Sequence, residues 1–330
     1  MCLYNKDYIN TIYIFFIMVR LHTYDNKNDA YEGLTQQLFK HIETTHFVRP
    51  DIDTWPRDFL PIPDDLDTRK RISNAFNLAL PGKEAGIELL DFWHKNHRYR
   101  PVWKRINYYQ TNERYNPQYK ESRGKIWSQH YFFRKGRIPT SQIHMIESLE
   151  SDEKSAKYYA ASLPYTQGIY YSYNSDEARK SFMGRWIISS FHCAILTINS
   201  DGSIGSYFPG SDRKTESASY YPIQEQNSPQ TDTTISKRTL MKIPRILLLM
   251  FNNREQNLWE YILSPDKRND ITFTILEKHP NIHLFTDIKD FKEIIKREAE
   301  KTKEQEEITD IKDPRYKLRV SECSRGFWND

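Results

Sequence analysis

The stretch Phe191-His-Cys-Ala-Ile-Leu-Thr-Ile-Asn-Ser-Asp-Gly-Ser-Ile-Gly-Ser-Tyr-Phe-Pro209 carries the strongest structural pattern in the chain. Its first half is rich in β-forming residues, and 199–202 supplies turn residues before the sequence becomes apolar again. This composition predicts a β-hairpin. A period of two places His192 and Ala194 on one face of the first strand and Cys193 on the other.

Periodic apolar residues predict helices on both sides of this hairpin. They fall at 28–45, 66–79, 83–97, 152–161, after Pro244 and at 285–307, and 271–276 is a candidate strand. The character of the sequence changes near residue 165. We therefore predict an α+β protein with a mainly helical region at 18–160 and a small antiparallel-sheet domain at 161–330. Residues 1–17 fit either a translation start at Met18 or a short apolar N-terminus, too short to span a membrane.

Scarce glycine and cysteine limit the chemistry. The 330 residues include 11 glycines and three cysteines, Cys2, Cys193 and Cys323. Neither G-x-G-x-x-G nor G-x-x-x-x-G-K-[ST] occurs, so the common dinucleotide and phosphate-binding loops are absent. No C-x-x-C occurs, and the few cysteines favour a soluble protein in a reducing compartment. We expect no cofactor, and one thiol is the candidate nucleophile.

Cys323 is the best-placed thiol. Ser321 is a good N-cap, so Cys323 would lie in the first turn of a helix, where the helix dipole lowers a thiol pKa. His192, at the start of a strand, is the candidate base. The alternative makes His192 a hydrogen-bonded core histidine and Cys323 a tail residue.

Two motifs resemble a known family. Ser206-Tyr-Phe-Pro209 and Tyr316-Lys-Leu-Arg-Val-Ser-Glu-Cys-Ser324 are similar to the histidine hairpin and the cysteine motif of circularly permuted papain-like proteins. These are the NlpC-like and lecithin-retinol-acyltransferase-like hydrolases and acyltransferases, which include bacterial toxins and effectors. The resemblance covers about 185–325 and implies a papain-like α+β domain. It implies a thiol amidase, peptidase or acyl transferase with Cys323, His192 and Asp212 as its catalytic group.

The same resemblance implies a protein or lipid as substrate. The Glu-rich stretch at 298–307 resembles the export region of effectors that intracellular bacteria deliver into the host cytosol. A weaker resemblance links Trp55-Pro-Arg-Asp58 and His192-Cys193 to guanidine-modifying deiminases, but the glycines of that family are missing. Histidine pairs at 94/97 and 279/283 lack the partners of a metal motif, so we expect no metal site.

Residues 92–140 form a basic and aromatic segment. They contain twelve Lys and Arg but two acids, against a net charge of +4 for the whole chain. Cations and rings together suit RNA, an anionic lipid surface or an acidic protein, and a solvated basic face over buried aromatics is the fourth interpretation. A non-enzymatic interaction protein is therefore the alternative to the thiol enzyme. The candidate polyanion-binding residues are Arg98, Arg100, Lys104, Arg105, Arg123, Lys125, Arg134, Lys135 and Arg137.

Overall fold

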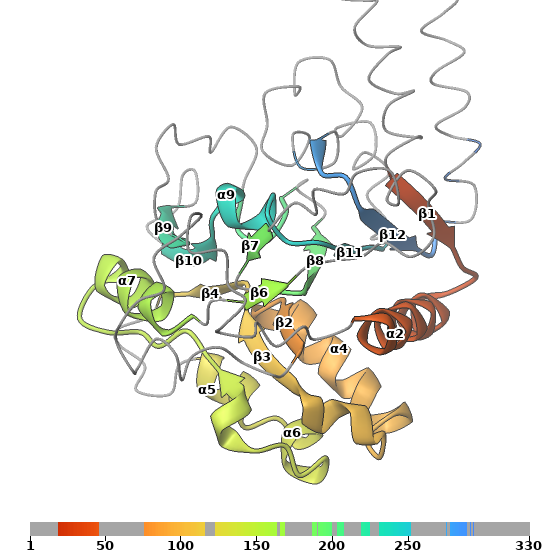
Figure 1. Cartoon of the computed structure of the whole chain (residues 1–330), viewed down its shortest axis with the longest axis horizontal. Helices are drawn as coiled ribbons and strands as arrows, with labels where there is room; N and C mark the ends of the chain where they lie inside the picture. The colour runs from red at the N-terminus through yellow and green to blue at the C-terminus, as the bar shows by residue number, and fades with distance from the viewer. Residues whose placement is uncertain are drawn as a thin grey trace, which may run out of the picture.

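A seven-stranded sheet forms the centre of the molecule in the computed structural model (Figure 1). The structure describes residues 19–45, 76–115, 123–163, 166–168, 187–189, 191–199, 203–207, 219–224, 231–251, 275, 278–288, 291 and 293. The strands of the main sheet are β1 (Val19–Thr23), β2 (Phe76–Leu80), β3 (Ile106–Gln110), β5 (Ile143–His144), β8 (Cys193–Ile198), β11 (Ile246–Met250) and β12 (Ile282–Thr286).

Two smaller sheets accompany the main one. The first contains β4 (Asn112–Arg114), β10 (Thr231–Ile235) and β9 (Tyr220–Gln224), and the second contains β6 (Thr166–Gly168) and β7 (Ile187–Ser189). The helices are α2 (Lys27–Thr44), α4 (Lys83–Asn96), α5 (Arg123–Ser128), α6 (Tyr131–Lys135), α7 (Asp152–Ser162) and α9 (Lys237–Leu240), with 3-10 turns η1 (Pro101–Arg105) and η2 (Thr140–Gln142).

All neighbouring strands of the main sheet are parallel, in the order β1-β12-β11-β8-β2-β3-β5. Parallel strands are buried on both faces, so they read as continuous apolar runs rather than alternating ones. The run Ile246–Met250 is an example, because all five of its residues are buried. The sheet takes strands from both sides of residue 161.

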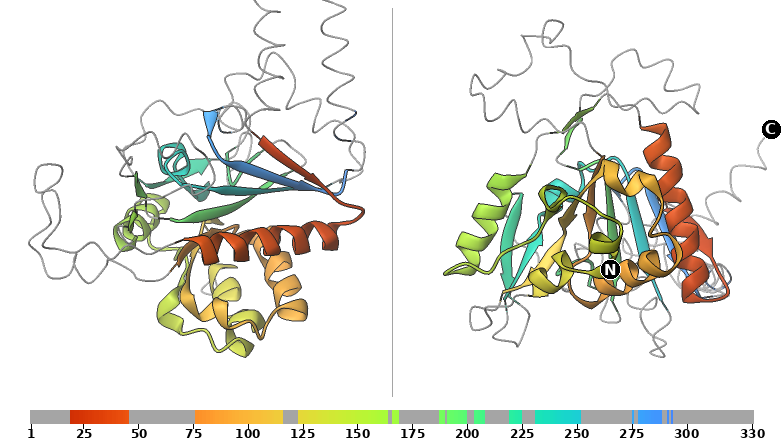
Figure 2. Two further views of the ribbon diagram at one scale, coloured as in Figure 1. Left: turned by 45° about the vertical axis from the view of Figure 1, so that its right-hand side comes forward. Right: turned by 90° about the horizontal axis from the view of Figure 1, so that it is seen from below.

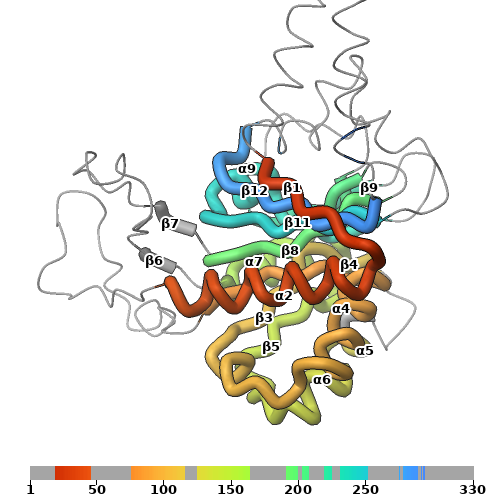
Figure 3. The backbone as a smooth tube through the Cα atoms, turned by 90° about the vertical axis from the view of Figure 1, so that its right-hand side faces the viewer, coloured from red at the N-terminus to blue at the C-terminus, as the bar shows by residue number. Residues whose placement is uncertain are grey.

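Helices cover one face, and a mixed layer covers the other. Leu34 and Leu38 of α2 and Trp93 of α4 pack with Leu78 and Ile195 on one face. Figure 2 shows α2 on the same side as α4, α5 and α6, and Figure 3 shows α2 lying along the sheet. On the other face Ala194, Leu196 and Leu248 pack with α7, β9, β10 and α9.

The predicted papain-like antiparallel domain is wrong. Strand β8, which was expected to begin a hairpin, is a central parallel strand between β11 and β2. In the described residues that follow it, isolated bridges join Ile198 to Ile204 and Ile204 to Tyr207. Described residues 203–207 therefore form a turn and not the second strand of a hairpin. The alternation itself is correct, because Cys193 and Ala194 belong to the cores of opposite faces.

The predicted helices are confirmed where the sequence has a clear polar face. Helices α2, α4 and α7 match the predicted 28–45, 83–97 and 152–161. Residues 76–79 and 246–250, predicted as helical, are strands because they cross the buried centre of a parallel sheet. Residues 282–286 are also a strand, and Ile275, expected in a strand, is helical. Within the described ranges, no helix is long and apolar enough to cross a membrane.

Candidate functional site

The winding of the main sheet reverses between β2 and β8. From β2 the chain passes through α4 to β3 on one side, whereas from β8 it continues through β9, β10 and α9 to β11 on the other. In open parallel sheets, ligands bind beyond the carboxyl ends of the strands at such a reversal. The segments that follow β2, β3 and β8 at this edge therefore form the candidate site.

A tight turn joins β2 to α4. Gly82 is the N-cap of α4, and its N–H donates to Asn112 Oδ1 at 3.1 Å. A Cβ on Gly82 would lie 1.8 Å from the Asn112 carbonyl oxygen, and one on Gly86 would lie 1.9 Å from the Pro81 carbonyl oxygen. At both positions the backbone of α4 lies so close to a neighbouring carbonyl oxygen that only glycine fits. The free N–H groups and the dipole of a helix start favour a bound anion.

Lys83, the first residue of α4, has a left-handed backbone with φ 54°. This conformation costs a non-glycine residue about 1–2 kcal/mol. Its ammonium group pairs with the Asp232 carboxylate, and it lies 3.4 Å from Ser206 Oγ. The side chain of Lys83 is 18% exposed and that of Asp232 is 4% exposed. Strain that surrounding contacts hold in place is typical of functional sites.

Four separate segments meet around this lysine. Asn112 Nδ2 donates to Ser206 Oγ at 2.8 Å, which ties the end of β3 to the loop after β8. Arg114 Nε lies 3.5 Å from Asp232 Oδ1, and these two residues also face each other in the pairing of β4 with β10. We name Lys83, Asn112, Arg114, Ser206 and Asp232 the carboxyl-edge cluster.

A buried carboxyl group lies next to the cluster. Glu113 is 1% exposed and accepts hydrogen bonds from Gln110 Nε2 and the Arg114 N–H, both at 2.9 Å. Burial raises the pKa of Glu113, and the charge of Asp232 adds to the rise. The two hydrogen bonds and the charge of Lys83 oppose it. The site therefore contains two carboxyl groups in different environments.

The loop after β8 is shaped by its own polar contacts. Asn199 Nδ2 donates to Ser203 Oγ at 2.9 Å, and the Asn199 N–H donates to the Ser203 carbonyl oxygen at 3.0 Å. Gly205 has φ +63°, the left-handed region that favours glycine. Tyr207 is fully buried next to this turn. These contacts bring Ser206 back over the carboxyl edge of the sheet.

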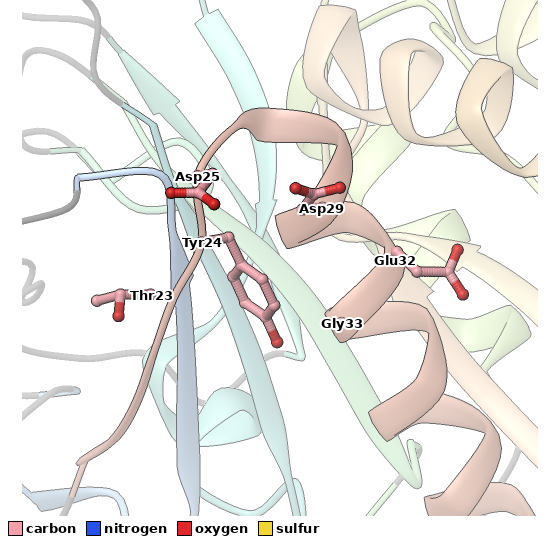
Figure 4. Close-up of a pocket in the computed structure, with 6 residues that line it drawn as sticks. All are labelled: Thr23, Tyr24, Asp25, Asp29, Glu32 and Gly33. Carbon is pink, nitrogen blue, oxygen red and sulfur yellow. The ribbon is translucent and has the colours of Figure 1, made fainter.

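An acidic hollow of about 510 Å³ lies at the far edge of the main sheet, beyond the end of β1 (Figure 4). The Tyr24 ring points at Gly33 there, and a Cβ on Gly33 would lie 1.9 Å from Tyr24 Oη. Strands β12, β11 and β8 separate β1 from β2, so the hollow is remote from the winding reversal. Its lining residues are Thr23, Tyr24, Asp25, Asp29, Glu32 and Gly33.

His192 lies at the amino end of β8, on the opposite edge from the cluster. It is 4% exposed, its Nδ1 accepts from the Asn77 N–H at 2.8 Å, and its ring stacks on Phe76 at 5.1 Å. Its carbonyl oxygen is 3.2 Å from His41 Nε2. Burial lowers the pKa of His192 to about 4. This environment is that of a neutral, hydrogen-bonded core histidine.

Of the predicted thiols and their partners, the structure describes His192 and Cys193, and neither lies at the carboxyl edge. Cys193 is fully buried, and burial raises its pKa to about 12, so it is not a nucleophile of the deiminase type. Cys323 and Asp212 lie outside the described residues, as do 55–58. Within the part of the chain that the structure describes, no group of three or more His, Cys, Asp or Glu residues could hold a metal ion.

The aromatic residues of the basic segment mostly form core. Trp93, Trp103, Trp127 and Phe132 are buried, and their rings contact one another or Phe133. The basic side chains described on α4, η1, α5 and α6 are exposed or half-buried, whereas the Arg123 side chain is outside the described set.

The carboxyl-edge cluster was not predicted from the sequence. One signal was available, because the apolar run 76–80 is followed at once by Pro81, Gly82 and a helical pattern. A strand, a glycine turn and a helix in this order can form an anion site. Because 66–79 was predicted to be helical, Pro81 and Gly82 were interpreted as a turn between two helices and not as a turn between a strand and a helix.

Solved structures share the fold at low sequence identity. The 6-phosphogluconolactonase from Trypanosoma cruzi has a TM-score of 0.57 at 15% identity, covering 82% of this chain and 94% of that one. The Plasmodium vivax 6-phosphogluconolactonase has a TM-score of 0.57 at 12% identity, covering 85% and 94%. These similarities concern the fold alone.

Curated relatives match a shorter stretch. Glucosamine-6-phosphate deaminase of Staphylococcus saprophyticus is 30% identical over 105 residues, which is 28% of this chain and 43% of the relative. A Staphylococcus epidermidis deaminase is 27% identical over the same length. The chain thus spans less than half the length of these relatives.

A sequence profile described as glucosamine-6-phosphate isomerases/6-phosphogluconolactonase matches residues 62–283. The identification as a papain-like thiol hydrolase of the effector type is therefore wrong. One motif of that resemblance lies around β8, where the residues fit a central strand and its loop equally well, and the other, at 316–324, lies outside the described residues. Since the match covers most of the sequence and the parallel sheet agrees with it, the chain belongs to the glucosamine-6-phosphate isomerase/6-phosphogluconolactonase family.

Proposed function

We propose that the chain binds a 6-phosphorylated hexose derivative at the carboxyl-edge cluster and converts it by acid–base chemistry. The observation that carries this proposal is the placement of Lys83. A strained, partly buried lysine stands at the start of α4, beside the winding reversal of a parallel sheet. Membership of a family named for two sugar-phosphate enzymes supports the substrate class.

The start of α4 suits the phosphate group. Gly82 has no side chain to cap the helix, and its own N–H donates to Asn112 Oδ1. The N–H groups of the first turn, the positive end of the helix dipole and the Lys83 ammonium would together bind a phosphate. The phosphate would then compete with Asp232 for Lys83.

The rest of the cluster suits the sugar. Asn112 and Ser206 offer neutral donors and acceptors for hydroxyl groups, and Arg114 offers a cation. Asp232 is the candidate proton-transfer group, because its carboxylate would lose a cationic partner as the phosphate takes Lys83. Lactone hydrolysis, for which the family is named, and amino-sugar deamination, for which its curated relatives are named, both require proton transfer.

Calorimetric titration tests the binding step. The full chain should bind 6-phosphogluconate or glucosamine 6-phosphate at least about tenfold more tightly than gluconate or glucosamine, since charge-assisted contacts to phosphate contribute the difference. Lys83→Met should remove most of this preference. Lys95→Met, in an exposed position on the same helix, is the matched control and should retain it. Equal binding of phosphorylated and unphosphorylated sugars would contradict the proposal.

Turnover separates the two reactions. Loss of 6-phosphogluconolactone and release of ammonium from glucosamine 6-phosphate should be measured side by side. We expect one of them, and we expect Asp232→Asn to lower kcat by about 100-fold or more while KM changes little. Binding of both sugar phosphates with neither reaction would reject the catalytic half of the proposal and leave the binding half standing.

A further inference from the structure

The amino edge of the main sheet carries a second charged surface, far from the carboxyl-edge cluster. Helix α4 begins at the carboxyl edge and ends at the amino edge, and η1 and η2 lead directly into the amino ends of β3 and β5. Gln142 Nε2 donates to the Lys104 carbonyl oxygen at 2.9 Å, so η1 and η2 lie together. We define the amino-edge surface as Arg98, Arg100, Lys104, Arg105, Arg134, Lys135 and Arg137.

Positive charge predominates on this surface. Six of its seven side chains are exposed, and Arg98 is half-buried. Within the described part of 91–137 the acids are Asp91 and Glu113. Glu113 is buried at the other edge, and Asp91 Oδ1 contacts His130 Nε2 at 3.1 Å. Outside this segment, Glu32 of α2 interacts electrostatically with Arg100 and contacts His97 Nε2 at 2.7 Å. The excess of positive charge that remains favours an anionic partner.

Two exposed tyrosines accompany the cations. Tyr99 is 79% exposed and Tyr131 is 57% exposed. The Arg98 guanidinium lies 4.6 Å from the Tyr99 ring centroid, and the Arg134 guanidinium lies 5.5 Å from that of Tyr131. Each pair therefore offers a flat ring next to a planar cation, which is the combination that stacks on unpaired bases and neutralises their phosphates.

Buried aromatic rings anchor the backbone beneath the surface. Trp103 is buried beneath η1, and its Nε1 donates to the His97 carbonyl oxygen at 2.8 Å. Trp93 and Phe132 pack against Trp103, which joins η1 to α4 and α6. Because the backbone that carries the cations is already fixed, binding would order only side chains.

We propose that the amino-edge surface binds single-stranded nucleic acid, with RNA as the test ligand. The described surface favours this partner over a membrane. Its exposed large apolar residues are Tyr99, Tyr131 and the nearby Ile126, without the apolar stripe that inserts into lipid. Tyrosine rings between arginines instead fit bases, whose stacking needs no particular sequence. The binding is independent of the sugar-phosphate site at the other edge.

Fluorescence anisotropy with a labelled oligouridylate of about 20 nucleotides tests the proposal on the full chain. Affinity should fall steeply from about 50 to 200 mM KCl, with a log–log slope of about −0.7 per phosphate contacted. Lys104→Ala/Arg105→Ala should weaken binding about tenfold and make the slope less negative by about 1.4. The matched control, Lys154→Ala/Lys157→Ala on α7, should leave both unchanged.

A second pair of variants tests the rings. Tyr99→Ala/Tyr131→Ala should weaken RNA binding by about fivefold or more, because two stacking platforms are lost. Tyr158→Ala, which removes a 61% exposed tyrosine of α7, should have no effect. Thermal melts confirm that each variant is folded, and Lys83→Met should bind RNA like the native chain.

Four outcomes would overturn the assignment. One is no binding at low salt, and another is equal loss in the α7 controls. A third is an unchanged affinity in Tyr99→Ala/Tyr131→Ala, which would leave a non-specific charge effect. The last is tighter binding to phosphatidylserine vesicles or to polyglutamate than to RNA, which would assign the surface to a membrane or an acidic protein.

Discussion

Lys83 and Asp232 form an ion pair although 149 positions separate them in the chain. The pair joins the first turn of α4 to β10 of the small antiparallel sheet. It therefore fixes that sheet over the carboxyl edge of the main one. Arg114 adds a second cation near the same carboxylate, at 3.5 Å. The geometry of the candidate site depends on this contact between two sheets.

Replacing Asp232 with Asn should destabilise the fold. The change leaves the partly buried Lys83 ammonium without its counter-charge, and we expect a loss of about 2–3 kcal/mol in the free energy of unfolding. Urea denaturation of the native chain and the variant measures it. Glu150→Gln, which breaks an exposed pair with Lys154, is the control and should change stability by less than about 0.5 kcal/mol. A loss of equal size in both variants would argue against a special role for the Asp232 pair.

Gly82→Ala should be far more harmful than Gly33→Ala. At Gly82 the added Cβ meets the backbone oxygen of Asn112 at 1.8 Å, so either strand β4 or helix α4 must shift. At Gly33 it meets the end of the Tyr24 ring, which can rotate away. We expect Gly82→Ala to cost about 3 kcal/mol and to weaken sugar-phosphate binding, and Gly33→Ala to cost about 1 kcal/mol. The free energy of unfolding and the calorimetric affinity check the two parts, and similar costs would contradict the backbone argument.

His192 should make the protein sensitive to acid. Its pKa is about 4 in the fold against 6.5 for the ordinary side chain, so the unfolded chain takes up the proton first as the pH falls. The native chain should lose about 3 kcal/mol between these pH values through this residue. His192→Asn keeps an acceptor for the Asn77 N–H and should lose correspondingly less. Parallel stability curves for the two proteins would show that His192 does not titrate in this way.

Glu113 should act in the opposite direction. Its pKa is raised in the fold, so the folded state holds the proton to higher pH than the unfolded state does. Stability then falls as the pH rises from the ordinary pKa of 4.5 through the raised value. The difference in unfolding free energy between the native chain and Glu113→Gln should therefore shrink or change sign with rising pH. A difference that grows with pH would reverse the assigned direction of the shift.

Local patterns predicted the amphipathic helices and failed on the sheet. Helix α4 shows a polar face and a capping turn in its own sequence, so 83–97 could be assigned correctly. The runs 76–80 and 246–250 have no polar face, and an apolar run of five residues fits a buried strand or helix equally well. Their strand character comes from neighbours far away in sequence, such as Ala194 beside Ile246.

For the same reason, the spacing of residues in the sequence could not predict the candidate site. Lys83, Asn112, Ser206 and Asp232 belong to segments that no short motif connects. The sequence favoured His192 and the cysteines because histidine and cysteine are reactive types, but His192 and Cys193 are buried, and burial disfavours the charged form of each. The parallel order of the strands brings these segments together at the carboxyl edge.

The pairing of β1 with β12 has a consequence for biosynthesis. Val19 lies beside Ile282, so β1 cannot pair with β12 until most of the chain has been synthesised. Closing so long a loop is slow and costs conformational entropy before any contact repays it. Strand β11 meanwhile has an uncovered side on which β12 has yet to dock. The nascent chain therefore carries an open strand edge, which favours aggregation, until β12 arrives.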